Sequence, residues 1–144
     1  MQHIELMAPA GNFESLQAAL DNGADSIYFG VEQLNMRARA SINFTLDDLL
    51  EISRRCKEKN VRTYLTLNTI IYDHDLTIVK TLIKQAKDAD ITAVIAMDQS
   101  VIATAREVGM EVHISTQINI TNIETVKFYA LFADTMVLSR ELSL

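Results

Sequence analysis

The chain alternates between short apolar runs and longer segments whose apolar residues recur with helical spacing. The apolar runs lie at residues 4–7, 26–29, 62–67, 93–97, 111–114 and 135–138, and each has the length of a β-strand. Between them, sets such as Phe13, Leu16 and Leu20 would fall on one face of a helix. This alternation predicts parallel strands joined by helical crossovers.

Capping residues mark where some of these helices should begin. Thr45 with Asp48, and Thr121 with Glu124, have the spacing of a capping box, so we expect helices to start at Thr45 and Thr121. The apolar side of the helix that follows Thr45 is expected to contain Leu46, Leu49, Leu50 and Cys56.

Two folds alternate strands and helices in this way, the open doubly wound sheet and the (βα) barrel. The segment "APAGN" after the first strand lacks the glycine fingerprint of the nucleotide-binding sheet, which favours the barrel. A closed barrel of eight units takes about 250 residues, whereas this chain has 144. We therefore expect a single domain, residues 1–144, that forms an incomplete TIM-like (βα) barrel of about six parallel strands and ends before the barrel closes. Its open sheet edges would be covered by self-association or by a partner chain.

Polar side chains follow the apolar runs directly, on the side where a barrel carries its active site. If the strand at residues 111–114 alternates regularly, then His113, Ser115 and Gln117 share one face. The expected catalytic residues are His113 and Glu141. The expected substrate-binding residues are Arg37, Arg39, Asn68, Asp98, Ser115, Gln117, Asn119 and Arg140.

Each of these groups also has an interpretation that needs no ligand. Arg37 and Arg39, two residues apart, would point the same way and suit a carboxylate or phosphate, or they would be solvated and balance surface acids. Asp98 would cap a helix. His113 would be a satisfied core histidine, and Glu141 would form a surface pair with its neighbour.

Metal and thiol chemistry have little support in the sequence. Asp73, His74 and Asp75 resemble metal ligands, but acids ahead of a helix also complement its dipole, and we expect no metal. Cys56 is the one cysteine, which excludes an internal disulfide and a cysteine-only metal cage. It lies on an apolar helical stripe, so we expect a packed thiol. No Ser-His-Asp, HExxH or phosphate-loop signature occurs.

Composition narrows the class of protein further. With 49% hydrophobic and 22% charged residues, the chain should be ordered and globular. Its apolar runs are far shorter than the ~18 residues of a membrane span, and its start lacks the features of a secretory signal. We expect a cytoplasmic protein without membrane contact. The net charge of −6 disfavours unspecific nucleic-acid binding but leaves a local basic patch open.

Four ordered motifs carry a resemblance to a known family. The segments "LMAPAGNFESLQAAL", "GADSIYFGVEQLNMRARASINFT", "HISTQINITN" and "VLSRELSL" are similar to the N-terminal region of the collagenase-like peptidases, peptidase family thirty-two of the class of unassigned mechanism. The resemblance covers nearly the whole chain. It reaches residues 8–12, Arg37, Arg39, residues 113–119 and residues 139–143, which include most of the strand-end positions named above.

The resemblance implies more than one activity. Some members were described as collagen-degrading proteases, and others act in hydroxylation of tRNA, ribosomal RNA or ubiquinone precursors. The hydroxylation members carry an iron–sulfur cluster on four cysteines beyond the "SRELS" motif. Cys56 matches none of these ligands, so we expect no cofactor in this chain and an iron–sulfur cluster only in a full-length relative.

Three hypotheses follow. In the first, the chain is the N-terminal barrel portion of an enzyme that hydroxylates RNA or a small molecule, and is inactive alone. In the second, it is a peptidase acting on proteins, although peptide hydrolysis needs an activated nucleophile or a metal-bound water. In the third, it is a subunit without catalysis of its own that a partner completes.

Overall fold

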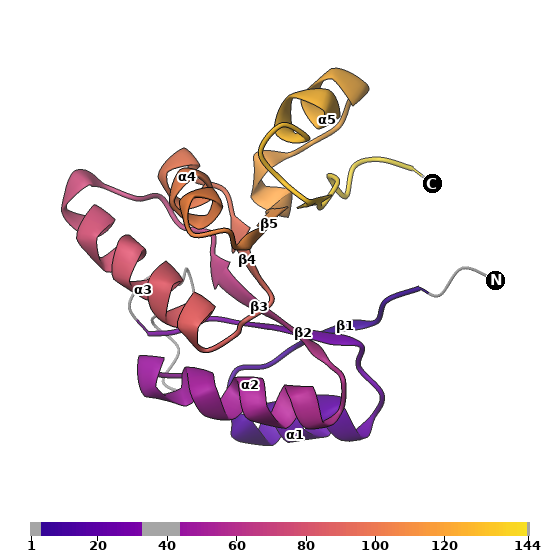
Figure 1. Ribbon diagram of the computed structural model, residues 1–144. Helices are drawn as coiled ribbons and strands as arrows, with labels where there is room; N and C mark the ends of the chain where they lie inside the picture. The colour runs from indigo at the N-terminus through magenta and orange to yellow at the C-terminus, as the bar shows by residue number, and fades with distance from the viewer. Residues whose placement is uncertain (1–3, 33–43, 144) are drawn as a thin grey trace.

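The computed structural model describes residues 4–32 and 44–143. Its centre is a parallel sheet with the strand order β1-β2-β3-β4-β5-β6, and each strand pairs with the one that precedes it in the chain. Figure 1 shows the sheet with its helices on one face. The strands are β1 (Met7–Pro9), β2 (Ser26–Phe29), β3 (Arg62–Leu67), β4 (Ala93–Ala96), β5 (Glu111–Ile114) and β6 (Thr135–Met136).

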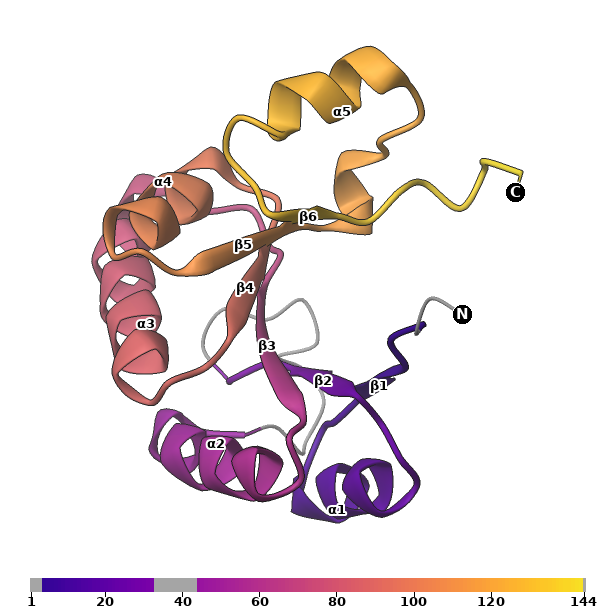
Figure 2. The same cartoon turned by 45° about the vertical axis from the view of Figure 1, so that its right-hand side comes forward.

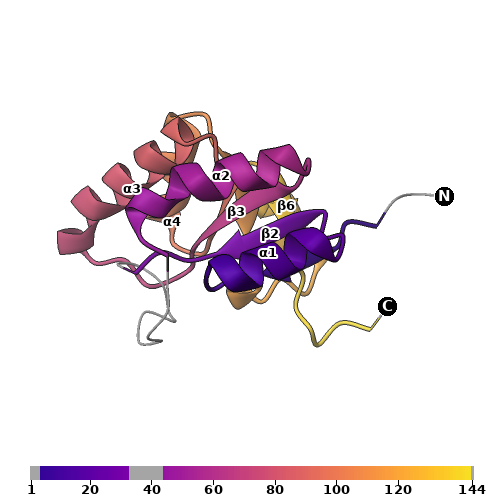
Figure 3. The ribbon, with the colours of Figure 1, turned by 90° about the horizontal axis from the view of Figure 1, so that it is seen from below.

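The sheet curls, and β1 and β6 form its two edges (Figure 2). Seen from below, α1 and α2 run side by side against the outer face (Figure 3). The structure is thus half of a (βα) barrel, which confirms the predicted incomplete barrel of six parallel strands. The helices are α1 (Phe13–Asp21), α2 (Leu49–Glu58), α3 (Leu76–Asp88), α4 (Gln99–Glu107) and α5 (Ile123–Tyr129), and single 3-10 turns are η1 (Leu46–Asp48), η2 (Asp73–Asp75) and η3 (Thr116–Ile118).

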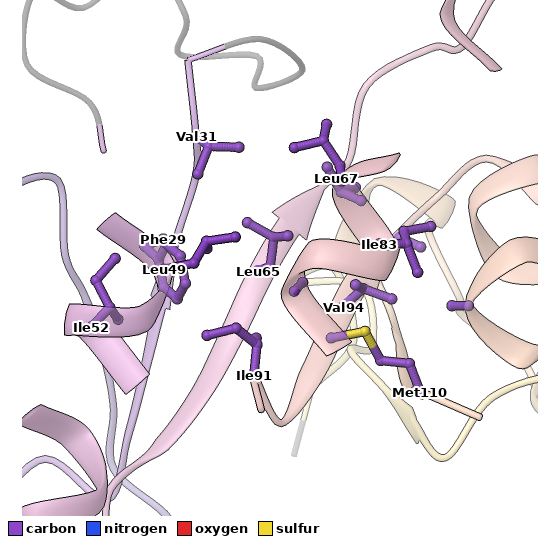
Figure 4. Close-up of a cluster of buried hydrophobic side chains, with 14 of the residues drawn as sticks. Phe29, Val31, Leu49, Ile52, Leu65, Leu67, Ile83, Ile91, Val94 and Met110 are labelled. Atoms are coloured by element: carbon purple, nitrogen blue, oxygen red, sulfur yellow. The ribbon is translucent and has the colours of Figure 1, made fainter. Parts of the chain in front are cut away.

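Side-chain alternation gives the sheet an apolar outer face and a more polar inner face. The outer-face residues pack under the helices and form the main hydrophobic core (Figure 4). The inner face has a much smaller apolar cluster of Tyr64, Ala93 and Ile95, with Tyr28 packed against it. The best-buried labelled residues of the outer core include Phe29, Leu49, Ile52, Leu65, Leu67, Ile83 and Val94.

The structure corrects three expectations: two about where an element begins, and one about which residue faces the core. The first strand is Met7–Pro9 rather than residues 4–7, since Met7 is the residue that pairs with Ser26 of β2. Leu50 is 69% exposed, whereas Leu49 and Ile52 face the core from α2, which begins only after the turn η1. Asn122 rather than Thr121 caps α5, and its side chain accepts a hydrogen bond from the backbone of the third helical residue.

The capping box at Thr45 is present. The Thr45 backbone N–H donates to the Asp48 carboxylate at 2.7 Å. In the described part of the chain, no helix is both long and apolar enough to span a bilayer.

Candidate functional site

The carboxyl ends of the six strands lie along one edge of the half-barrel, because all strands are parallel and consecutive. We call this edge the rim. It holds the residues that follow each strand: Asn68 after β3, Asp98 after β4, and residues 115–119 after β5. The isolated bridge between Ile120 and Leu138 extends the pairing of the last two strands, so residues 139–141 also lie on the rim.

The polar segment after β5 is built by local hydrogen bonds. The Ser115 backbone N–H donates to the carbonyl of Ala96 at 2.8 Å, which ties the segment to β4. The Ser115 hydroxyl accepts from the Gln117 backbone at 3.3 Å and caps the turn η3. Asn119 ends that turn in the left-handed conformation (φ 55°), which asparagine tolerates better than most residues. These bonds let the chain turn here without glycine or proline before Ile120 re-enters the core.

Asp98 connects two loops of the rim. Its carboxylate accepts from the backbone and the hydroxyl of Ser100, at 2.8 and 2.6 Å, and so caps α4. The second carboxylate oxygen accepts from the Ile71 backbone N–H at 3.4 Å. The capping interpretation of Asp98 thus agrees with the structure, and the same side chain holds the loop after β3.

The end of β6 brings together the last predicted residues. Ser139 is buried, and its backbone N–H donates to the carbonyl of Ile120 at 2.9 Å. The Ser139 hydroxyl donates to the carboxylate of Glu141. Arg140 and Glu141 are both exposed, so they remain accessible to a ligand at the rim. Arg37 and Arg39 fall outside the described residues.

His113 lies on the inner face, and its hydrogen-bond partner is Glu111 rather than a rim residue. The His113 Nε2 atom is 2.7 Å from Glu111 Oε1, and the His113 side chain is only 7% exposed. Its ring centroid lies 4.6 Å from that of Tyr64, on the far side of β4.

Further charged side chains extend this pair into a network, here called the inner-face cluster: Glu5, Arg62, Tyr64, Glu111 and His113. Arg62 binds both oxygens of Glu111, at 2.7 and 2.9 Å, and lies 3.6 Å from the carboxylate of Glu5. The Tyr64 hydroxyl donates to Glu5 at 2.5 Å. The cluster therefore links the segment before β1 with β3 and β5.

The cluster shifts the ionisation of its members. Partial burial opposes ionisation of Glu5, but the neighbouring hydroxyls and the Arg62 charge outweigh it and lower the Glu5 pKa. Burial of Tyr64, together with the bond to Glu5, raises the Tyr64 pKa. Burial also opposes the Arg62 charge, but the bond to Glu111 prevails and raises the Arg62 pKa.

Sequence reasoning named only one member of the inner-face cluster, His113. The signal for the others is the same alternation, because Glu111 is two residues before His113 and Arg62 is two residues before Tyr64, each pair within one strand. Glu5 gives no such signal, since it precedes the first strand.

The described residues do not fit an iron–sulfur cluster. Cys56 is the one cysteine of the chain, and it is buried within α2. Within residues 4–32 and 44–143, no group of three or more His, Cys, Asp or Glu side chains could hold a metal ion.

Solved structures support the half-barrel. The structure of a U32 peptidase is similar over 96% of this chain and 59% of its own, with a TM-score of 0.75 and 15% identity. Deoxyribose phosphate aldolase from Aeropyrum pernix is similar over 92% of this chain and 63% of its own, with a TM-score of 0.71 and 15% identity. At this identity the likeness shows the fold alone.

Curated relatives match the sequence along almost its whole length. A collagenase of Porphyromonas gingivalis is 52% identical over 97% of this chain, and tRNA hydroxylation protein P1 of Bacillus subtilis is 34% identical over 96%. The chain spans about a third of the length of these relatives, 34% and 33% respectively. The sequence profile of peptidase family U32 matches residues 11–144. The chain therefore belongs to peptidase family U32.

Proposed function

We propose that this chain is the N-terminal barrel portion of an enzyme that hydroxylates RNA or a small molecule, and that it is inactive alone. The rim would bind the substrate. Asn68 and Asn119 carry amides that can recognise the edge of a base by paired donors and acceptors. Arg140 and Glu141 are exposed beside them and can add charge-assisted bonds.

The main support for the proposal is that the two side chains a peptidase could use for catalysis, His113 and Cys56, are both buried. His113 is buried and engaged by Glu111, so it is poorly placed to activate a water or a hydroxyl at the rim. Burial raises the pKa of Cys56 to about 11, which keeps this thiol in its protonated, weakly nucleophilic form. The similarity to a tRNA hydroxylation protein also supports hydroxylation rather than peptide cleavage.

Peptide cleavage is the second candidate function, and the higher identity to a collagenase favours it. Under that alternative, Glu141 would act as the catalytic acid or base and the rim would bind a peptide. Glu141 is exposed and bound by the Ser139 hydroxyl, so it can reach a substrate.

Exposed apolar side chains near both edges of the sheet indicate where a partner would bind. The side chains of Ile4 and Leu6 are exposed beside β1, and those of Phe128 and Leu131 are exposed on and after α5. We propose that further protein, either a second copy or a partner chain, covers these sheet edges.

The test compares two activities of the purified chain. We expect no cleavage of denatured collagen or of a fluorogenic peptide, and measurable binding of single-stranded RNA. The matched variants are Glu141→Gln at the rim and Glu124→Gln on α5, both at exposed positions. Peptide cleavage that survives metal chelation and is lost in Glu141→Gln but not in Glu124→Gln would contradict the proposal and favour the peptidase.

A further inference from the structure

Two aromatic rings stand exposed in the loop between β3 and α3, on the rim. Tyr72 is 61% exposed and the His74 side chain is 80% exposed. Their ring centroids lie 5.7 Å apart and their planes differ by 1°, so the rings are parallel. We call them the ring pair. Parallel, offset rings of this kind present an outer face on which another flat ring can stack.

The loop that carries the ring pair is held at several points. Ile71, the preceding residue, packs against the main core, and its backbone N–H donates to Asp98. The Tyr72 backbone N–H donates to the Asp75 carboxylate at 3.0 Å, which fixes the turn η2. The Asp75 carboxylate also lies 3.5 Å from the His74 ring. The two rings are therefore pre-ordered, which lowers the entropic cost of binding to them.

The position and charge of the ring pair indicate what it binds. Asn68 directly follows β3, the strand that leads into this loop, so the ring pair and Asn68 belong to the same strand-end loop. The protein carries a net charge of −6, and Asp73 is exposed next to the rings. Attraction to phosphates is thus weak here, so binding of RNA at the ring pair has to come from stacking on a base rather than from the phosphate backbone.

We propose that Tyr72 and His74 form a stacking platform for an unpaired base of single-stranded RNA at the rim. The proposal rests on the proposed function and names the contact by which the same site selects an RNA substrate. Unpaired bases in RNA commonly stack on Tyr or His side chains. A peptide substrate is the competing occupant, although proline-rich peptides dock into grooves lined by several aromatic side chains rather than on one stacked pair.

The experiment measures binding of a fluorescein-labelled, unstructured RNA of about ten nucleotides by fluorescence anisotropy. The variant Tyr72→Ala should weaken binding about tenfold, and Tyr72→Trp should retain it. The matched control is Ile123→Ala on α5, which removes a large apolar side chain of similar exposure (62%) away from the loop and should change binding less than twofold. Circular dichroism confirms that each variant is folded.

Three further probes separate the outcomes. An abasic oligomer of the same length should bind at least tenfold more weakly, and raising the salt from about 50 to about 200 mM should weaken RNA binding by about threefold at most. Equal binding of the native protein and Tyr72→Ala would overturn the platform but leave the proposed function standing. If the native protein binds no RNA, the platform and the RNA part of the proposed function are both wrong, and only a small-molecule substrate is left for hydroxylation. If Tyr72→Ala loses binding of a collagen-like peptide while its RNA binding is unchanged, the ring pair binds a peptide rather than RNA.

Discussion

Replacing Arg62 by methionine should destabilise the half-barrel, because Arg62 joins three segments through the inner-face cluster. The change removes the guanidinium group, whose carbon lies 5.3 Å from the Tyr64 ring centroid, together with the two bonds to Glu111 and the contact with Glu5. Hydrogen bonds to charged groups are each worth about 1.5–3 kcal/mol. The Arg62 side chain is 43% exposed, so solvent screens part of this energy. We expect a loss of about 2 kcal/mol in the free energy of unfolding.

Urea unfolding followed by circular dichroism measures this loss, which corresponds to a fall of about 6 °C in Tm. The matched control is Arg106→Met, which removes a more exposed pair with Asp134 and should cost about 0.5 kcal/mol. A double-mutant cycle with Glu111→Gln should give a coupling energy of about 1 kcal/mol or more. If Arg62→Met costs no more than Arg106→Met, or the coupling energy is zero, the cluster does not hold the strands together.

Three further predictions concern the core and the buried titratable groups. Leu65→Ala, at a side chain with no exposure, should cost about 3 kcal/mol in urea unfolding, whereas Leu50→Ala should cost almost nothing; similar losses would contradict the outer-core assignment. The Tyr64 pKa is higher in the folded than in the unfolded state, so the protonated side chain stabilises the fold. This stabilisation is complete below about pH 10 and is lost as the pH rises above that value. Unfolding curves across this range should show the loss, and Tyr64→Phe should flatten it. Cys56, with its pKa raised to about 11, should react slowly with an aromatic disulfide reagent at neutral pH and rapidly once urea unfolds the protein; fast reaction of the folded chain would contradict its burial.

The spacing of apolar residues in the sequence predicted most of the strands and helices. The strands β2, β3 and β5 have the bounds that their apolar runs predict. The first strand was misplaced, since an apolar run alone does not reveal which of its residues pair with the next strand. Leu50 was assigned to the core because a 3-10 turn cannot be distinguished from the first turn of an α-helix by apolar spacing.

The rim was predictable to a lesser degree. Strand ends in a (βα) barrel share one side by topology, so Asn68, Asp98 and Ser115 could be placed there from the sequence. The partners of a side chain could not: the bond from Ile71 to Asp98 joins two loops that are 27 residues apart. The contact of His113 with Tyr64 spans β4, so it can be recognised only once the register of three strands is known.

The consecutive order of the strands bears on how the protein is made. Since no strand inserts between two earlier ones, each βα unit can dock as soon as it leaves the ribosome, without waiting for residues that are still to be synthesised. Short loop closures of this kind also favour rapid folding. In the same arrangement, a whole unit added at either flank would leave every existing strand pairing intact.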